Sequence, residues 1–172
     1  MYRGILVMGG NGCGKTTLGR RVAALLGCPH IDLEDYAFEP SEIPYARPRP
    51  REEVCALIRS QLHAHPRFVF SAVNGDMGKE INALYDFIVY LHAPLAVRME
   101  RIQKRSLERF GSRVLEGGDM YESEQAFVRF AAGRSLEKAE RWASRMRCPV
   151  FHVDGTQPIE MNAQLIVRRL EH

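Results

Sequence analysis

The sequence lacks the long apolar runs and closely spaced cysteines that mark several large classes of protein. No apolar run approaches the ~20 residues that a membrane-spanning helix needs. The four cysteines, at positions 13, 28, 55 and 148, include no close pair. Neither a zinc site nor a disulfide framework is therefore predicted. We expect that no signal peptide precedes the first predicted strand. We also expect a cytoplasmic location and no membrane partner.

A strong excess of one charge is also missing. The net charge is +3 over 172 residues, which is too small to predict nucleic-acid binding by itself. Hydrophobic residues make up 45% of the chain and charged residues 26%, as in an ordinary globular protein. The length predicts a single domain over residues 1–172. We expect the protein to be a monomer or a homodimer.

A glycine-rich segment near the beginning carries the most specific motif. It reads Gly9-Gly-Asn-Gly-Cys-Gly14-Lys15-Thr16-Thr17, which matches the phosphate-binding loop G-x-x-x-x-G-K-[ST]. Glycines let backbone amides line an anion nest, the lysine reaches the β and γ phosphates, and the first threonine binds Mg²⁺. An apolar run precedes the motif and a helical pattern over residues 15–26 follows it. We therefore predict ATP and Mg²⁺ as ligands, with nucleotide contacts from Gly9, Asn11, Gly12, Cys13, Gly14, Lys15, Thr16 and Thr17.

Strand-like and helix-like segments alternate along the rest of the chain. Strands are predicted at residues 3–8, 30–33, 67–73, 87–92 and 150–153. Helices are predicted at residues 15–26, 50–63 and 94–110, and from the residues after 158 to 170. This alternation predicts an α/β fold with a parallel, doubly wound sheet. Ligands bind at the carboxyl edge of such sheets, which the irregular stretches 38–51 and 111–118 could overhang. We expect Phe127, Phe130 and Trp142 to pack a helix into the core.

Carboxylates follow the second predicted strand in the run Asp32-Leu33-Glu34-Asp35. Strand alternation would put Asp32 and Glu34 on the same side, where the acidic cluster could hold Mg²⁺ or orient an acceptor. Thr16 and Asp32 are the predicted metal ligands. If the acceptor is a hydroxyl group, Asp32, Glu34 or Asp35 could be its general base. A solvated acidic turn or a helix cap is the alternative for each carboxylate.

Arginines recur along the helix predicted at residues 94–110. Arg98, Arg101, Arg105 and Arg109 share one helical stripe. We predict a lid that closes this stripe over ATP and excludes water. Arg101 and Arg105 are the predicted catalytic arginines, and Lys15 is the predicted catalytic lysine. Arg105 is also a predicted nucleotide contact, and Arg134 and Arg141 in the following helix are weaker candidates. A solvated basic face is the alternative reading.

The third predicted strand lacks an acid. Residues 68–76 hold no carboxylate where a motor ATPase or a GTPase would hold Mg²⁺, and no glutamate follows to activate water. The guanine-binding element Asn-Lys-x-Asp is absent as well. Both absences favour transfer of a phosphoryl group to a positioned acceptor, where catalysis is mostly positioning and charge neutralisation.

The chain resembles the P-loop kinases of the nucleoside-monophosphate kinase and shikimate kinase type, and more narrowly small bacterial AAA-family ATPases with unassigned acceptors. The resemblance rests on the glycine-rich motif, on Asp32-x-Glu34, on Leu91-x-Ala-Pro94 before Arg101, and on Asp154-Gly-Thr156-x-Pro158. Two departures keep the acceptor open. The Asp-x-Asp of shikimate kinases reads Asp-x-Glu here, and the Asp-Gly that ends the third strand in many nucleotide kinases reads Ser71-Ala72.

The resemblance implies a three-layer P-loop NTPase fold with a five-stranded parallel sheet of order 2-3-1-4-5 and helices on both faces. It also implies a helical lid at about residues 108–135 and an acceptor region at about residues 36–65. Adenine would pack near Gly155, Thr156 and Pro158.

These observations lead to an ATP- and Mg²⁺-dependent kinase whose small acceptor is a nucleotide, a nucleoside or another metabolite. The predicted acceptor contacts are Tyr36, Tyr45, Arg47, Arg49, Asn74 and Arg109. One alternative is a non-catalytic module that senses ATP through lid closure. Another is a polynucleotide end kinase, against which the modest net charge counts.

Overall fold

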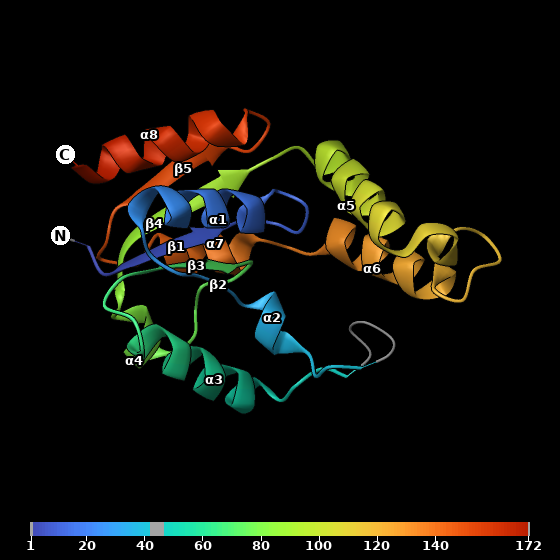
Figure 1. The fold of residues 1–172 in the computed structure, drawn as a ribbon, viewed down its shortest axis with the longest axis horizontal. Helices are drawn as coiled ribbons and strands as arrows, with labels where there is room; N and C mark the ends of the chain where they lie inside the picture. The colour runs from blue at the N-terminus through green and yellow to red at the C-terminus, as the bar shows by residue number, and fades with distance from the viewer. Residues whose placement is uncertain (1, 42–46, 172) are drawn as a thin grey trace.

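The computed structural model describes residues 2–41 and 47–171. Tyr45, one of the predicted acceptor contacts, lies outside these residues. The described residues form a sheet of five parallel strands in the order β2-β3-β1-β4-β5, as Figure 1 shows. The predicted α/β fold and strand order are therefore confirmed. The strands are β1 (Gly4–Met8), β2 (His30–Asp32), β3 (Phe68–Ala72), β4 (Tyr85–His92) and β5 (Val150–Asp154).

Helices connect the strands and cover both faces of the sheet. They are α1 (Lys15–Leu26), α2 (Glu34–Ala37), α3 (Arg51–His63), α4 (Lys79–Asn82), α5 (Leu95–Phe110), α6 (Tyr121–Gly133), α7 (Glu137–Ala143) and α8 (Ile159–Glu171), with a 3-10 helix η1 (Gly111–Val114). The sequence pattern predicted α1, α3, α5 and α8 to within a residue or two at the bounds it gave. It missed α2 and α4, because helices of four residues are too short to show helical periodicity.

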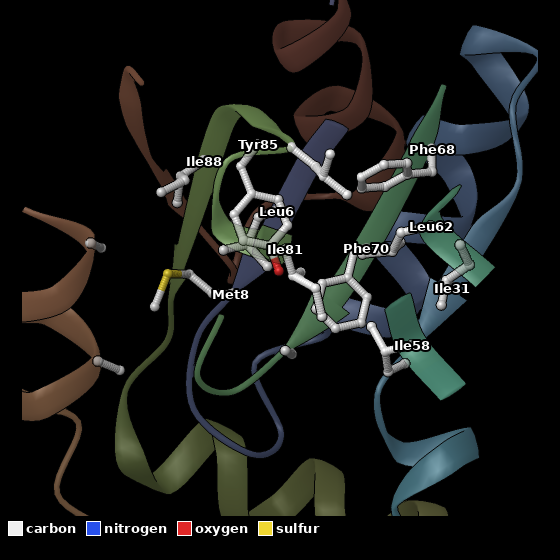
Figure 2. Close-up of a cluster of buried hydrophobic side chains, with 14 of the residues drawn as sticks. Leu6, Met8, Ile31, Ile58, Leu62, Phe68, Phe70, Ile81, Tyr85 and Ile88 are labelled. Carbon is white, nitrogen blue, oxygen red and sulfur yellow. The ribbon is translucent and has the colours of Figure 1, made fainter. Parts of the chain in front are cut away.

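One face of the sheet packs against α3, α4 and α7. Figure 2 shows side chains of β1, β3 and β4 lying against those of α3 and α4. Phe70 is fully buried between the strands and the helices, and its ring stacks on Tyr85 with 6.2 Å between the centroids. On the helical side, Ile58 and Leu62 of α3 are fully buried as well. Burial of this apolar area is the main source of stability of this layer.

The opposite face packs against α1 and α8. Ile5 and Val7 of β1 point to this face, while Leu6 and Met8 point to the other. Because successive strand residues alternate between two covered faces, the central strands read as continuous apolar runs. Leu18 and Val22 of α1, fully buried, complete this second core. The phosphate-loop helix is therefore anchored directly on the central strands.

Helices α5 and α6 lie side by side and extend away from the carboxyl end of the sheet, as Figure 1 shows. Phe130 of α6 was expected in the core, but that prediction is wrong, because its side chain is 55% exposed. The reason is that α6 packs on α5 instead of on the sheet. The guanidinium of Arg134 lies 5.5 Å from the Phe130 ring centroid. Among the described residues, we find no helix that is long and apolar enough to cross a membrane.

Two leucines of α1 provide a test of the second core. Leu18→Ala removes a fully buried side chain, so the free energy of unfolding should fall by about 2–5 kcal/mol. Leu25→Ala is the matched control on the same helix, because Leu25 is 39% exposed, and it should cost about 0.5 kcal/mol. Urea denaturation measures both values. Equal losses in the two variants would contradict the described packing of α1.

Candidate active site

The loop between β1 and α1 adopts backbone conformations that favour glycine. Gly12 and Gly14 have φ values of +82° and +98°, in the left-handed region. A Cβ atom at Gly12 would also lie 2.4 Å from the carbonyl oxygen of Arg98. Helix α1 begins directly after Gly14 with no side-chain cap. Its first N–H groups and the positive end of its dipole therefore suit an anion such as phosphate.

Lys15 places a buried ammonium group over this loop. The residue is only 7% exposed, and its Nζ donates a hydrogen bond of 3.2 Å to the carbonyl oxygen of Gly10. Burial lowers the pKa of Lys15, and the nearby carboxylate of Glu34 partly opposes this effect. Because burying a cation is unfavourable, a phosphate group bound at the loop would stabilise the charged lysine.

Thr16 and Asp32 meet between α1 and β2. The Thr16 hydroxyl donates to Asp32 Oδ2 at 2.5 Å, and Asp32 is 5% exposed. Hydroxyl and carboxylate oxygens are the ligands that Mg²⁺ prefers, so this donor set fits the predicted metal. The structure brings these two predicted ligands together, and their role in metal binding stays a prediction.

Glu34 lies close to Asp32, but the predicted reason, alternation along a strand, does not apply. Strand β2 ends at Asp32 and Glu34 is the first residue of α2, so strand alternation does not orient Glu34 and that argument was wrong. Instead, Asp32 Oδ1 accepts a hydrogen bond of 3.0 Å from the Glu34 backbone N–H. This local turn folds the chain back toward the phosphate loop.

A cavity of about 500 Å³ lies between α1, α2 and α5. Its lining combines carboxylates with arginines and the first turn of α1. The lining residues are Thr16, Thr17, Arg20, Asp32, Glu34, Asp35, Phe38, Glu39, Pro40, Ser41, Arg105 and Arg109. The cavity thus unites the predicted acidic cluster with two predicted arginines. Sequence reasoning missed Arg20 and Glu39, although Arg20 lies one helical turn after Thr16 and this spacing could have revealed it.

The arginine stripe of α5 divides into two pairs. Arg98 is buried and its Nη1 lies 3.4 Å from the carbonyl oxygen of Asn11. Arg101 donates to the carbonyl oxygens of Cys13 at 3.2 Å and Gly155 at 2.9 Å. These two arginines hold the phosphate loop in place, whereas the next two along α5 line the cavity. The catalytic role predicted for Arg101 is not tested by these contacts and stays a prediction.

Arg134, in the segment after α6, adds another cation beside the phosphate loop. Its Nη1 lies 3.4 Å from Oδ1 of Asn11. Burial lowers the pKa of Arg134, and the carboxylate of Glu34 partly opposes this effect. Arg134 is one of the two weaker candidates that the sequence offers, and the structure places it beside the phosphate loop.

The loop after β5 is rigidly folded next to the phosphate loop. Asp154 Oδ1 accepts hydrogen bonds from the N–H of Thr156 at 2.8 Å and from its hydroxyl at 2.7 Å, which lower the pKa of the Asp154 carboxyl. The Gly155 N–H donates to the carbonyl oxygen of His92 at 2.6 Å. A Cβ atom at Gly155 would lie 2.8 Å from that oxygen. The adenine contacts predicted for Gly155, Thr156 and Pro158 stay predictions.

Most of the predicted acceptor residues are absent from the lining of the cavity within the described part of the chain. Arg49 donates to the carbonyl oxygens of Tyr36 and Phe38, at 3.3 and 2.6 Å, and forms an ion pair with Glu53. These contacts tie the two ends of the irregular segment together. Within the described part of the chain, the lining of the cavity does not include Tyr36, Arg47, Arg49 or Asn74. Their contacts with an acceptor stay predictions, as does that of Arg109, which the cavity does include.

Several solved structures share this fold over nearly the whole chain. Shikimate kinase from Acinetobacter baumannii, in complex with shikimate, is 18% identical, with a TM-score of 0.61 over 99% of this chain and 93% of that one. A gluconokinase from Sinorhizobium meliloti 1021 is 20% identical, with a TM-score of 0.58 over 98% of this chain and 93% of that one. At such low identity, these similarities establish the fold of the P-loop kinases.

Sequence comparison gives the family. The Uncharacterized protein YqaC of Bacillus subtilis (strain 168) is 28% identical over 162 residues, which are 90% of this chain and 89% of that protein. The family described as AAA domain matches residues 5–116, which is more than half of the chain and includes the phosphate loop, the acidic turn and all of α5. The chain therefore belongs to the AAA domain family and has the fold of a P-loop kinase.

Proposed function

We propose that this chain transfers the γ-phosphoryl group of ATP, with Mg²⁺, to a hydroxyl group of a small acceptor. The observation that carries the proposal is the cavity of about 500 Å³ beside the phosphate loop. Its wall joins the first turn of α1 to the acidic turn after β2 and to two arginines of α5. Such a cavity can hold an acceptor next to the phosphoryl group that it receives.

The charges of the cavity favour a hydroxyl acceptor over a phosphate acceptor. Asp32, Glu34, Asp35 and Glu39 line it together. Three arginines, Arg20, Arg105 and Arg109, line the cavity as well. Because two of these arginines are assigned to the phosphoryl group in transfer, the carboxylates predominate around the acceptor, where they can accept hydrogen bonds from hydroxyl groups. A nucleoside or another polyhydroxylated metabolite therefore suits the cavity better than a nucleotide. The similar structures of a gluconokinase and a shikimate kinase also support a small-molecule acceptor.

Each group of side chains has a distinct role in the proposed reaction. The loop amides and Lys15 hold the phosphates, and Arg105 and Arg109 neutralise charge that develops during transfer. Thr16 and Asp32 would hold Mg²⁺, which supplies further charge neutralisation when bound. Glu34 or Asp35 accepts the proton of the acceptor hydroxyl. The α5–α6 extension, including the predicted lid at about residues 108–135, closes to exclude water.

Replacing the buried lysine tests phosphate binding. Lys15→Ala removes the ammonium group over the loop, so transfer from labelled ATP to the acceptor should fall by about 10²–10³-fold. The acceptor is found first by incubating the wild-type chain with pools of nucleosides, sugars and hydroxy acids. Lys104→Ala is the matched control, because Lys104 is an exposed cation of α5 with a side chain that is 74% exposed. Full transfer by Lys15→Ala would refute the proposal.

Two isosteric variants identify the general base. Glu34→Gln and Asp35→Asn each remove one carboxylate, and the variant that loses the base should lower kcat by about 10²–10⁴-fold. The KM for ATP should change little, because neither group is proposed to bind the phosphates. Steady-state kinetics at several pH values separates the two parameters. If both variants keep the wild-type kcat, no carboxylate of α2 serves as the base.

A further inference from the structure

A short polar chain lies in the otherwise apolar contact between α1 and the sheet. Ser71 of β3 is fully buried, and its hydroxyl donates to the carbonyl oxygen of Lys15 at 3.3 Å. His30 of β2 is partly buried, and its Nε2 lies 2.8 Å from Oγ of the same serine. The chain thus runs from an imidazole ring to the backbone of the phosphate-loop lysine.

The direction of these hydrogen bonds follows from the number of protons available. A serine hydroxyl has one proton, which here is donated to the Lys15 carbonyl. With that proton on the Lys15 carbonyl, the oxygen of Ser71 is left to accept from His30, which assigns to the imidazole the tautomer with a proton on Nε2. His30 supplies the donor that completes the chain, and a side chain without a donor at this position would leave the serine oxygen unpaired.

Gly19 makes room for this polar chain. It lies one turn after Lys15 on α1 and is itself buried. A Cβ atom at Gly19 would lie 2.5 Å from Oγ of Ser71 and 2.6 Å from Nε2 of His30. A side chain there would push α1 away from the two strands, so the backbone of α1 approaches the sheet unusually closely at this turn.

Strand register brings the polar chain and the acidic residue of the site together. In the pairing of β2 with β3, Asp32 lies opposite Ser71, and His30 precedes Asp32 by two residues. His30 and Asp32 therefore face α1 from the same side of the sheet. Asp32 binds the hydroxyl of Thr16, while the serine binds the carbonyl of Lys15. Two adjacent residues of α1 are thus fixed to the strands by directional contacts.

We propose that His30 is a positioning residue for phosphoryl transfer. Through Ser71, it holds the first turn of α1 at a fixed height and rotation above β2 and β3. Lys15 and Thr16 are thereby kept in the geometry that binds the phosphates and Mg²⁺. Apolar contacts such as that of Leu18 turn the apolar face of α1 toward the sheet, but they are not directional and define the position of the first turn less sharply than hydrogen bonds do. This inference rests on the proposed function.

The test compares variants of His30 that keep or lose the donor. His30→Leu removes it, and His30→Gln retains a side-chain N–H that can reach the serine. We expect His30→Leu to weaken binding of ATP with Mg²⁺ by about fivefold to tenfold, the effect of one hydrogen bond. His30→Gln should stay within about twofold of the wild type. Isothermal titration calorimetry measures both affinities, and His63→Leu is the control, because His63 is an exposed histidine on α3.

A double-mutant cycle checks that the histidine acts through the serine. Ser71→Ala should weaken binding at least as much as His30→Leu, and the double variant should be no weaker than Ser71→Ala alone. Urea denaturation of every variant measures folding separately. If His30→Leu does not fold, His30→Asn replaces it, because the shorter amide does not extend as far toward the serine.

The outcomes separate this inference from the proposed function. Equal affinity of the wild type, His30→Leu and His30→Gln would overturn the positioning role. Equal weakening of the leucine and glutamine variants would overturn it too, because the donor would then be irrelevant. If the affinities follow the expected order but the wild type phosphorylates no acceptor, the proposed function fails, and His30 positions the first turn of α1 for nucleotide binding only. A wild-type chain that does not bind ATP would refute both.

Discussion

The buried ammonium group of Lys15 is the constraint around which the site is organised. A cation held at 7% exposure is unfavourable unless anions or dipoles surround it. The structure supplies a contact with the carbonyl oxygen of Gly10 and the nearby charges of Glu34 and Asp32, while the first turn of α1 adds positive potential from its amides. The buried ammonium group and the positive end of α1 together favour the binding of a polyanion at the loop. The polar groups around the loop are already held in position for such a ligand by their hydrogen bonds.

Two layers of contacts keep that lysine in place, and they differ in kind. Apolar packing of α1 against the central strands supplies most of the stability and tolerates small sliding movements. Directional hydrogen bonds from Thr16, Ser71 and Arg101 then define the position of the loop along and around the helix axis. A catalytic group needs the second layer, because a displacement of about 1 Å can cost two orders of magnitude in rate.

The sequence was sufficient for features that depend on local pattern. The phosphate loop, the apolar runs of β1 and β4 and the periodicity of α5 are all local, so the fold class could be predicted. The strand order came from the resemblance to P-loop kinases, because no local pattern determines which strands pair. The site was predicted less completely, because its geometry depends on contacts between distant segments. The polar chain joins His30 to Ser71, which are 41 positions apart, and only the register of β2 on β3 brings them together. The hydrogen bonds of Arg49 to the carbonyl oxygens of Tyr36 and Phe38 could not be predicted, because they depend on a loop that has no periodic signal.

One side chain of α5 contacts both the phosphate loop and the loop after β5. The guanidinium of Arg101 binds the carbonyl oxygen of Cys13 in the phosphate loop and that of Gly155 in the loop after β5. Any tilt of α5 must therefore pull on both loops at once. The two loops are thereby mechanically coupled through α5, so neither loop can shift relative to this helix without straining a hydrogen bond of the same guanidinium group.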